Sequence, residues 1–375
     1  MKTLKKTVLA AAVTLFAGGT AALADMSFTT YADPTNPNYV AIPGWMERVK
    51  ERTDGAISWD VYMGGSLVPP KDALIGIGQG VAQGGQHVAT YSPSVNPLMA
   101  SLADLAFKVP DPLVVAFAST DYMLTDPEGR GEWLANNAVG LHGFSTPTYR
   151  FMCKARDMDS LADLTGKRIR TAGAPWARFV RAVGATEVSI PVGELYTALE
   201  RGLVDCALAD VSHISAGANL QDLLGSVVMI DVGPFFPGSA IVINRDIWTG
   251  FTPEQRRIIV EELPQTIVST QAAYERLAQD GLDVATKKGI QLNPPANDLT
   301  AAYDAFLGTI DADVIDAGKA AGVANIEQEV ADFTALLEKW KGLLGSVDRA
   351  DEAALAQLLK VEIFDKIDPE TLANP

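Results

Sequence analysis

The sequence predicts an α/β fold with two lobes, and three observations lead to this prediction. Segments typical of strands and of helices alternate along the chain up to about residue 250, an order that favours parallel sheets. About 350 residues remain after the N-terminal leader described below, more than one hydrophobic core usually holds. After residue 252 the chain becomes strongly helical, and one helix predicted there is long enough to brace both lobes.

The first series of elements extends to residue 124. A helix is indicated where Ile42, Trp45 and Val49 recur at helical spacing, and the turn residues 53–55 end it. The remaining elements follow from the same change between strand and helix periodicity. In order, we expect strands at 27–31, 58–62 and 86–90, and helices at 42–49, 71–80 and 112–124.

The second series begins near Leu141. Trp176, Phe179 and Val183 form an apolar stripe, which indicates a helix packed on a sheet. We expect strands at 149–154, 167–171, 187–189 and 204–209, helices at 175–183 and 193–202, and long helices at 271–288 and 326–344. The predicted lobe one comprises residues 25–147 and 236–275, and lobe two comprises 148–235 and 276–375 with the C-terminal helices.

The first 24 residues are typical of a signal peptide. Lysines at positions 2, 5 and 6 precede the apolar run 8–16, and residues 22–24 (Ala-Leu-Ala) resemble a signal-peptidase site. A membrane anchor is the alternative, but glycines at 18 and 19 interrupt the run before it reaches the length of a spanning helix. We therefore expect an exported chain that starts at Asp25 and does not insert into the membrane.

The composition is strongly acidic, with 46 acidic residues against 30 lysines and arginines and a formal charge of −16. Cleavage of the leader would remove three lysines and no acidic residue. A nucleic-acid partner is excluded, because phosphate backbones require clustered basic residues and no such cluster remains. Local arginines would have to hold a bound anion against this overall field.

The most informative motif is residues 167–175, Lys-Arg-Ile-Arg-Thr-Ala-Gly-Ala-Pro, in which a strand ends near Arg170 and a helix opens at the proline. At the carboxyl end of a parallel strand, Arg170 would face the ligand crevice of an α/β fold. Its planar fork of donors fits a carboxylate in bidentate fashion. A structural ion pair between strand and helix is the alternative. The motif therefore predicts an anion-binding protein.

This motif belongs to a set that resembles the solute-binding subunits of tripartite ATP-independent periplasmic (TRAP) transporters, the DctP family. The resemblance extends from residue 27 to about residue 306. Its segments are 160–170 (Ser-Leu-Ala-Asp-Leu-Thr-Gly-Lys-Arg-Ile-Arg), 192–205 (Val-Gly-Glu-Leu-Tyr-Thr-Ala-Leu-Glu-Arg-Gly-Leu-Val-Asp), 63–67 (Met-Gly-Gly-Ser-Leu), 80–82, 243–248 and 252–255.

The resemblance implies a two-lobed periplasmic solute-binding protein fold, a ligand enclosed between the lobes and a long helix spanning both. The family's carboxylate-clamping arginine falls on Arg170. Arg150 has the spacing of a second ligand-contacting arginine of some members, although its guanidinium could simply extend into water. Where many members carry a polar residue, four positions past a Val-Asp pair, this chain has Ala209 followed by Asp210.

Other candidate ligand-binding residues have both a functional and a structural interpretation. Tyr31, Asp33 and Tyr91 come just after strands of lobe one, where a ligand would be reached, but turn residues also occur there for local reasons. Trp176 could stack on a ligand or pack in the core. Asp210 could accept a hydrogen bond from a ligand hydroxyl or amine, or cap the helical segment that follows.

Cys153 and Cys206 lie in strands predicted for the same lobe. An even number of cysteines in an exported chain favours a disulfide, and two buried thiols are the alternative. The three histidines, His87, His142 and His213, show no metal-binding spacing, and no nucleophile elbow is present. We expect no metal, no cofactor and no catalytic residue.

These observations predict a periplasmic receptor that captures a small organic carboxylate and delivers it to an ion-gradient-driven TRAP permease. Participation of Arg150 would favour a dicarboxylate. A receptor for an ATP-driven importer or a sensor keeps the same binding role with a different partner. A periplasmic enzyme acting on a carboxylate is the alternative from another class.

Overall fold

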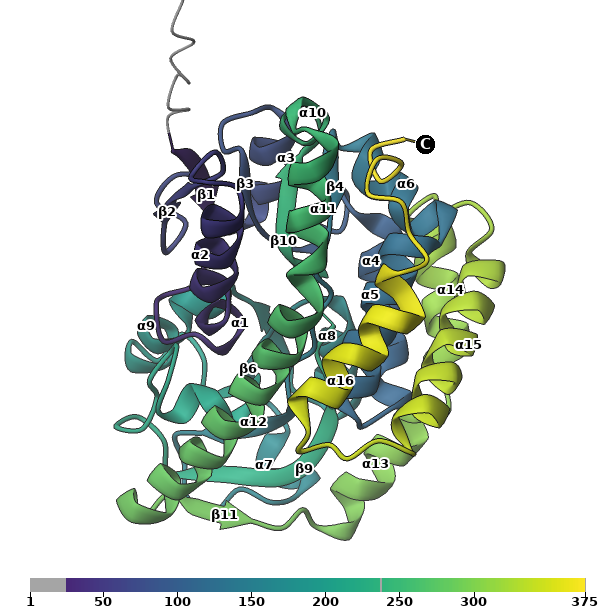
Figure 1. The fold of residues 1–375 in the computed structure, drawn as a ribbon. Helices are drawn as coiled ribbons and strands as arrows, with labels where there is room; N and C mark the ends of the chain where they lie inside the picture. The colour runs from purple at the N-terminus through teal and green to yellow at the C-terminus, as the bar shows by residue number, and fades with distance from the viewer. Residues whose placement is uncertain (1–24, 237, 375) are drawn as a thin grey trace, which may run out of the picture.

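The computed structural model describes residues 25–236 and 238–374, in which helices surround two sheets (Figure 1). The predicted signal peptide, residues 1–24, lies outside the described residues. Within the described part of the chain, no helix combines the length and apolar character needed to cross a bilayer.

The helices form most of the outer surface around the sheets. In chain order they are α1 Pro37–Val40, α2 Ile42–Arg52, α3 Ala73–Gly78, α4 Pro97–Leu102, α5 Pro112–Thr125, α6 Pro127–Ala135, α7 Leu161–Leu164, α8 Ala174–Ala182, α9 Leu195–Glu200, α10 Arg245–Gly250, α11 Pro253–Glu261, α12 Leu263–Lys288, α13 Asn297–Leu307, α14 Ile310–Ala320, α15 Ile326–Leu344 and α16 Glu352–Leu359. Short helical segments are η1 Pro70–Asp72, η2 Ala89–Tyr91, η3 Ala103–Lys108, η4 Val192–Glu194, η5 Val211–Ile214 and η6 Lys360–Phe364.

The first sheet has the strand order β2-β1-β3-β10-β4. The second sheet has the order β11-β9-β5-β8-β6-β7. Strands of the first are β1 Met26–Thr29, β2 Trp59–Tyr62, β3 Gly84–Val88, β4 Ala138–Gly140 and β10 Gly238–Asn244. Strands of the second are β5 Thr148–Cys153, β6 Arg168–Thr171, β7 Thr186–Ser189, β8 Cys206–Ala209, β9 Ser226–Pro234 and β11 Gln291–Asn293.

Both sheets are mixed, so the expectation of parallel sheets is wrong. β1 pairs in parallel with β2 and β3, and β6 with β7 and β8, as alternation predicts. However, β10 is antiparallel to β3 and β4, and β5 is antiparallel to β8 and β9. These antiparallel strands enter their sheet from the other one, since β5 follows β4 and β10 follows β9. Strands β9 and β10 are absent from the predicted elements, although their apolar runs at 227–230 and 240–243 are typical of buried strands.

The chain crosses from the first sheet to the second between β4 and β5, and returns between β9 and β10. Strands of the first sheet fall within residues 25–147 and 236–275, and strands of the second within 148–235 and 276–375. The distribution of the strands between the two sheets supports the predicted division into lobes, which stays a proposal.

A 26-residue helix, α12, links the two sheets. It contacts α1 and α2 beside the first sheet, and η5 and β11 at the second, so it spans both lobes (Figure 1). It starts at Leu263, earlier than the predicted residue 271. Pro264 is compatible with this start, because it lies in the first turn, where its missing N–H breaks no helical hydrogen bond. Gly289 ends the helix in the left-handed conformation, with φ of 70°.

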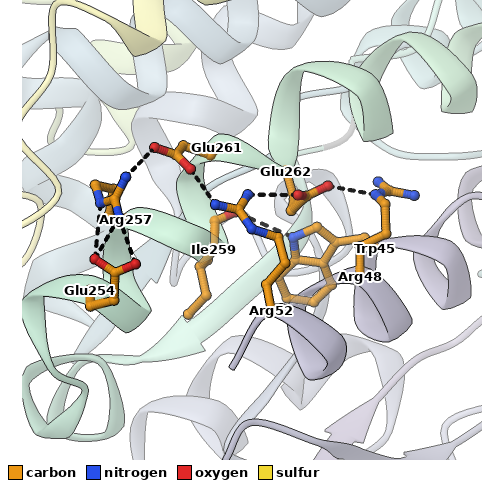
Figure 2. Close-up of polar contacts among 8 residues, drawn as sticks. All are labelled: Trp45, Arg48, Arg52, Glu254, Arg257, Ile259, Glu261 and Glu262. Atoms are coloured by element: carbon orange, nitrogen blue, oxygen red, sulfur yellow. Dashed lines mark hydrogen bonds and ion pairs between the residues drawn. The ribbon is translucent and has the colours of Figure 1, made fainter. Parts of the chain in front are cut away.

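The start of α12 is attached to α2 by ion pairs and hydrogen bonds (Figure 2). Glu262 accepts from Arg48 at 2.6 Å and from Arg52 at 2.7 Å, and Arg52 also pairs with Glu261 at 2.5 Å. The indole N–H of Trp45 donates to a backbone carbonyl of α11 at 3.4 Å. Two arginines of one helix thus hold the adjoining ends of two others.

Helices α14 and α15 pack on helices beside the first sheet, and α13 packs on α8 beside the second. Helix α15 has the predicted bounds and packs on α4 and α5, and α16 packs on α12. Because α5 is buried on all sides, it requires such a cover. The Trp340 ring meets Phe117 edge to face at 5.3 Å, and its N–H donates to Asp121 at 2.9 Å. The assignment of residues 276–375 to lobe two stays a prediction.

A disulfide joins Cys153 and Cys206. The two residues lie opposite each other on the antiparallel strands β5 and β8, with Cα atoms 4.1 Å apart. Both side chains are buried. The bond therefore fixes the pairing of two central strands in the second sheet.

Replacing Glu262 by Gln should lower the free energy of unfolding by about 0.5–1 kcal/mol at pH 7, because two charge-assisted hydrogen bonds weaken. Burial raises the pKa of Glu262, but hydrogen bonds from Arg52 and Arg48 outweigh it and hold the pKa below its ordinary value of 4.5. The stabilisation is therefore complete above that value and is lost as the pH falls through the lower folded pKa. Urea titrations at pH 7 and at about pH 3 measure the free energy of unfolding of the parent protein and of the variant. The difference between these two free energies should be smaller at the acidic pH.

Glu254→Gln is the matched control, because Glu254 and Arg257 form a pair whose side chains are 61% and 53% exposed. An exposed pair of this kind contributes little. Equal losses in the two variants would contradict the role assigned to Glu262.

Thiol titration of denatured, unreduced protein should find no free thiol. The bond closes a loop with a sequence separation of 53, which stabilises the fold by about 4 kcal/mol in the chain-entropy model. Reduction should therefore lower the melting temperature, while a Cys153→Ala/Cys206→Ala variant should not respond to reductant. Two titratable thiols in the parent protein would disprove the pairing.

Candidate functional site

A narrow cavity of about 20 Å³ lies where loops from both sheets meet. Tyr31 and Tyr91 come after β1 and β3 of the first sheet, and Val192 and Asp210 come after β7 and β8 of the second. Ligands of α/β sheets bind at such carboxyl ends. The lining residues are Tyr31, Asn36, Asn38, Tyr91, Phe144, Thr146, Tyr149, Val192, Asp210, His213, Phe235 and Tyr274.

Aromatic rings form most of the wall. Tyr31 and Tyr91 meet edge to face at 6.1 Å, and Phe144 stacks on Tyr274 of α12 at 6.3 Å. Burial raises the pKa of Tyr31, Tyr149 and Tyr274, so their hydroxyls remain protonated at neutral pH. The wall thus offers apolar faces and neutral hydroxyl donors to a small planar molecule.

Arg170 lies immediately behind this wall. It is on β6, with β7 and β8 on either side, and is 1% exposed. Its Nε donates to the carbonyl of Ile190 at 2.8 Å and its Nη1 to that of Leu208 at 3.3 Å. Among the described residues, no carboxylate lies within the 4.0 Å of an ion pair. The predicted alternative, a structural ion pair, therefore has no partner in that part of the chain.

Tyr149 connects Arg170 to the cavity. Its side chain lines the cavity, and burial raises the pKa of this phenol while the positive charge of Arg170 acts to lower it. The negative charge of Asp210 acts on the same phenol in the opposite direction. A cation and an anion therefore both act on a phenol that lines the cavity.

Asp210 lines the cavity and is 0% exposed. Its Oδ1 accepts hydrogen bonds from the backbone N–H of Ser212 at 3.1 Å and from the Ser212 hydroxyl. Asp210 thereby caps the N-terminus of η5. Its Oδ2 lies 3.5 Å from Nε2 of His213, without the geometry of a hydrogen bond. Burial lowers the pKa of His213, although Asp210 acts in the opposite direction.

Three other candidates from the sequence lie outside the lining. Trp176 is fully buried, with its ring 5.0 Å from Tyr149 and 4.9 Å from Phe235, so it supports the wall from behind. Asp33 accepts from the N–H of the second residue after it at 2.7 Å and forms a turn at the rim. Arg150 pairs with an exposed aspartate of β9 at 2.8 Å and lines a separate cavity beside α12.

Most of the lining residues are not among the candidates that the sequence indicates. Tyr149 adjoins Arg150 on β5, and the period of two in a strand places the two side chains on opposite faces. His213 follows Asp210 by three residues in the cap that the sequence indicates. Tyr274 lies in the predicted long helix. No local pattern distinguishes Asn36, Asn38, Phe144, Thr146 or Phe235 as lining residues.

Hydrogen bonds also cross the cleft directly. The Thr35 hydroxyl accepts from the N–H of Gly217 at 3.0 Å, and the Thr90 hydroxyl donates to the carbonyl of Ala172 at 2.8 Å. The Tyr91 hydroxyl accepts from the first N–H of η4 at 3.2 Å. Each bond joins a loop of the first sheet to a loop of the second, so the structure corresponds to a closed arrangement of the lobes.

Thr90→Val should weaken binding of an organic acid by about two- to tenfold, because a neutral hydrogen bond across the cleft is lost while side-chain shape is kept. Calorimetry with an acid identified by thermal-shift screening measures the change. Thr286→Val is the control, since the Thr286 hydroxyl donates only to the carbonyl one turn earlier on the exposed face of α12. Unchanged affinity in Thr90→Val would show that the bond does not contribute to closure.

The fold is similar to those of solved TRAP solute-binding proteins. One, from an unidentified marine microbe and specific for aromatic acid ligands, is 20% identical with a TM-score of 0.74, over 84% of this chain and 98% of that one. A Bordetella bronchiseptica protein with bound mandelate is 17% identical with a TM-score of 0.73, over 84% and 99%. A Bordetella pertussis receptor that binds pyroglutamic acid is 19% identical with a TM-score of 0.69, over 83% and 100%.

A sequence model of one family matches most of the chain. It is the model of DctP, bacterial extracellular solute-binding protein family 7, and it matches residues 28–312. The match includes the motif around Arg170 and both sheets. The chain therefore belongs to the DctP family of extracellular solute-binding proteins, as its sequence motifs predict.

Proposed function

We propose that this protein is the periplasmic receptor of a TRAP transporter and that it captures a small organic acid through its carboxylate. The observation that carries this proposal is the guanidinium of Arg170, buried beside an aromatic cavity and without an acidic partner among the described residues. A buried cation is costly unless it is paired. A ligand carboxylate supplies the missing charge.

Closure of the lobes strengthens this pairing. Water leaves the cleft as loops of the two sheets meet, and a lower local dielectric increases the attraction between guanidinium and carboxylate. The ligand therefore binds the closed form better than the open one and shifts the equilibrium between them. A membrane permease that recognises the closed form would receive only loaded receptor.

The proposed ligand has one carboxylate rather than two. Arg150, the candidate for a second anionic group, pairs with Asp231 and lines a different cavity. The similar proteins described above bind aromatic acids, mandelate and pyroglutamic acid. The aromatic wall of the cavity suits a compact ligand of that kind.

The partner and the absence of catalysis are proposed on family membership. The family consists of solute-binding proteins, which favours a receptor over an enzyme. A ligand recovered chemically intact after incubation, as judged by NMR, would agree with this role, and turnover would contradict it. Thermal-shift screening against a panel of organic acids identifies the ligand for these tests.

Arg170→Ala should weaken binding of that acid by about 30-fold or more, because it removes one partner of a buried charge pair. Arg170→Lys should also bind poorly, since lysine lacks the planar fork. Arg168→Ala is the matched control: Arg168 lies on the same strand but pairs with Asp205 at the surface, at 2.8 Å. Calorimetry on folded variants measures all three, and full affinity in both Arg170 variants would remove Arg170 from the site.

A further inference from the structure

The two oxygens of the Asp210 carboxylate have different surroundings. Oδ1 is held by the N–H and hydroxyl of Ser212, which fixes the orientation of the group. Oδ2 has no hydrogen-bond partner among the described residues, and the residue is 0% exposed. Asp210 lines the same cavity as the aromatic wall. An acceptor is therefore oriented in the cavity without a donor.

His213 does not supply that donor. Its Nδ1 accepts from the N–H of Ala218 at 3.4 Å, so the proton of the neutral ring is on Nε2, 3.5 Å from Oδ2. The ring is held against Gly217, where an added Cβ would lie 2.7 Å from Nδ1. Gly217 also has φ of 52°, which favours glycine. Gly217 and the N–H of Ala218 therefore hold the ring on its Nδ1 side.

We propose that the ligand carries, beside the carboxylate that Arg170 binds, a hydroxyl or N–H group that donates a hydrogen bond to Oδ2 of Asp210. This inference rests on the function proposed above and narrows its substrate class. Hydroxy acids, amino acids and lactam acids belong to the class, and plain carboxylic acids do not.

The electrostatics of the cavity favour this class. A plain acid would leave the buried Oδ2 unpaired and would place a second negative charge near it. A donor on the ligand satisfies Oδ2 and offsets part of that repulsion. In this proposal the ligand carboxylate binds Arg170 and the ligand donor binds Asp210. Recognition therefore requires a fixed distance between these two groups of the ligand within a narrow cavity.

Matched pairs of acids test the inference on the parent protein. The pairs are lactate with propionate, mandelate with phenylacetate, 3-hydroxybenzoate with benzoate, and pyroglutamate with cyclopentanecarboxylate. In each pair that binds, the member with the donor should bind at least about tenfold more tightly by calorimetry. Equal or tighter binding of the plain acids would overturn the inference while the proposed receptor function stands. If no organic acid binds, both fall.

Asp210→Asn locates the effect. Asparagine keeps the oxygen that caps η5 and replaces Oδ2 by a donor, so the preference for donor-bearing acids should disappear or reverse. Asp126→Asn is the control, since Asp126 caps α6 through one oxygen in the same way and lies outside the cavity lining. A preference that survives in Asp210→Asn would overturn the assignment to Asp210. The comparison of acid pairs on the parent protein remains decisive if this variant does not fold.

Discussion

Burial of the Arg170 guanidinium without a carboxylate partner among the described residues is the constraint on which the rest of the site depends. Two of its nitrogens donate to carbonyls at Ile190 and Leu208, just after β7 and at the end of β8, and neither partner carries a negative charge. Backbone carbonyls stabilise a cation partially, and an anion stabilises it fully. The second sheet therefore holds Arg170 in a position where a ligand carboxylate completes the pairing.

The two-lobed architecture makes that completion reversible. The chain passes between the sheets at two places in sequence, β4 to β5 and β9 to β10, and α12 makes a third link. Few covalent connections permit a hinge, while the bonds from Thr35, Thr90 and Tyr91 across the cleft are individually weak. Without a ligand, closure therefore gains little free energy. A ligand that pairs with Arg170 contributes most of the free energy that favours the closed form.

Local periodicity predicted much of the fold, and α15 has the predicted bounds, because an amphipathic stripe depends only on nearby residues. The direction of β5 and β10 could not be predicted in this way, since it depends on which sheet the preceding strand occupies. The motif at 167–175 predicted a strand that ends near Arg170, and β6 ends at Thr171. Spacing suggested a role for Arg150, but the face of β5 on which it lies directs it to Asp231. Lining residues such as Tyr274 come from distant segments and carry no local signal.

Asp210 illustrates why two interpretations of one residue need not compete. Capping η5 occupies Oδ1 alone, whereas a carboxylate offers about four acceptor sites on two oxygens. The cap restricts the side chain to one orientation, and that orientation is what leaves Oδ2 in the cavity without a donor. Recognition of a ligand donor then requires little further ordering of the protein, which reduces the entropic cost of binding. The structural role of Asp210 is therefore a condition for its proposed role in specificity.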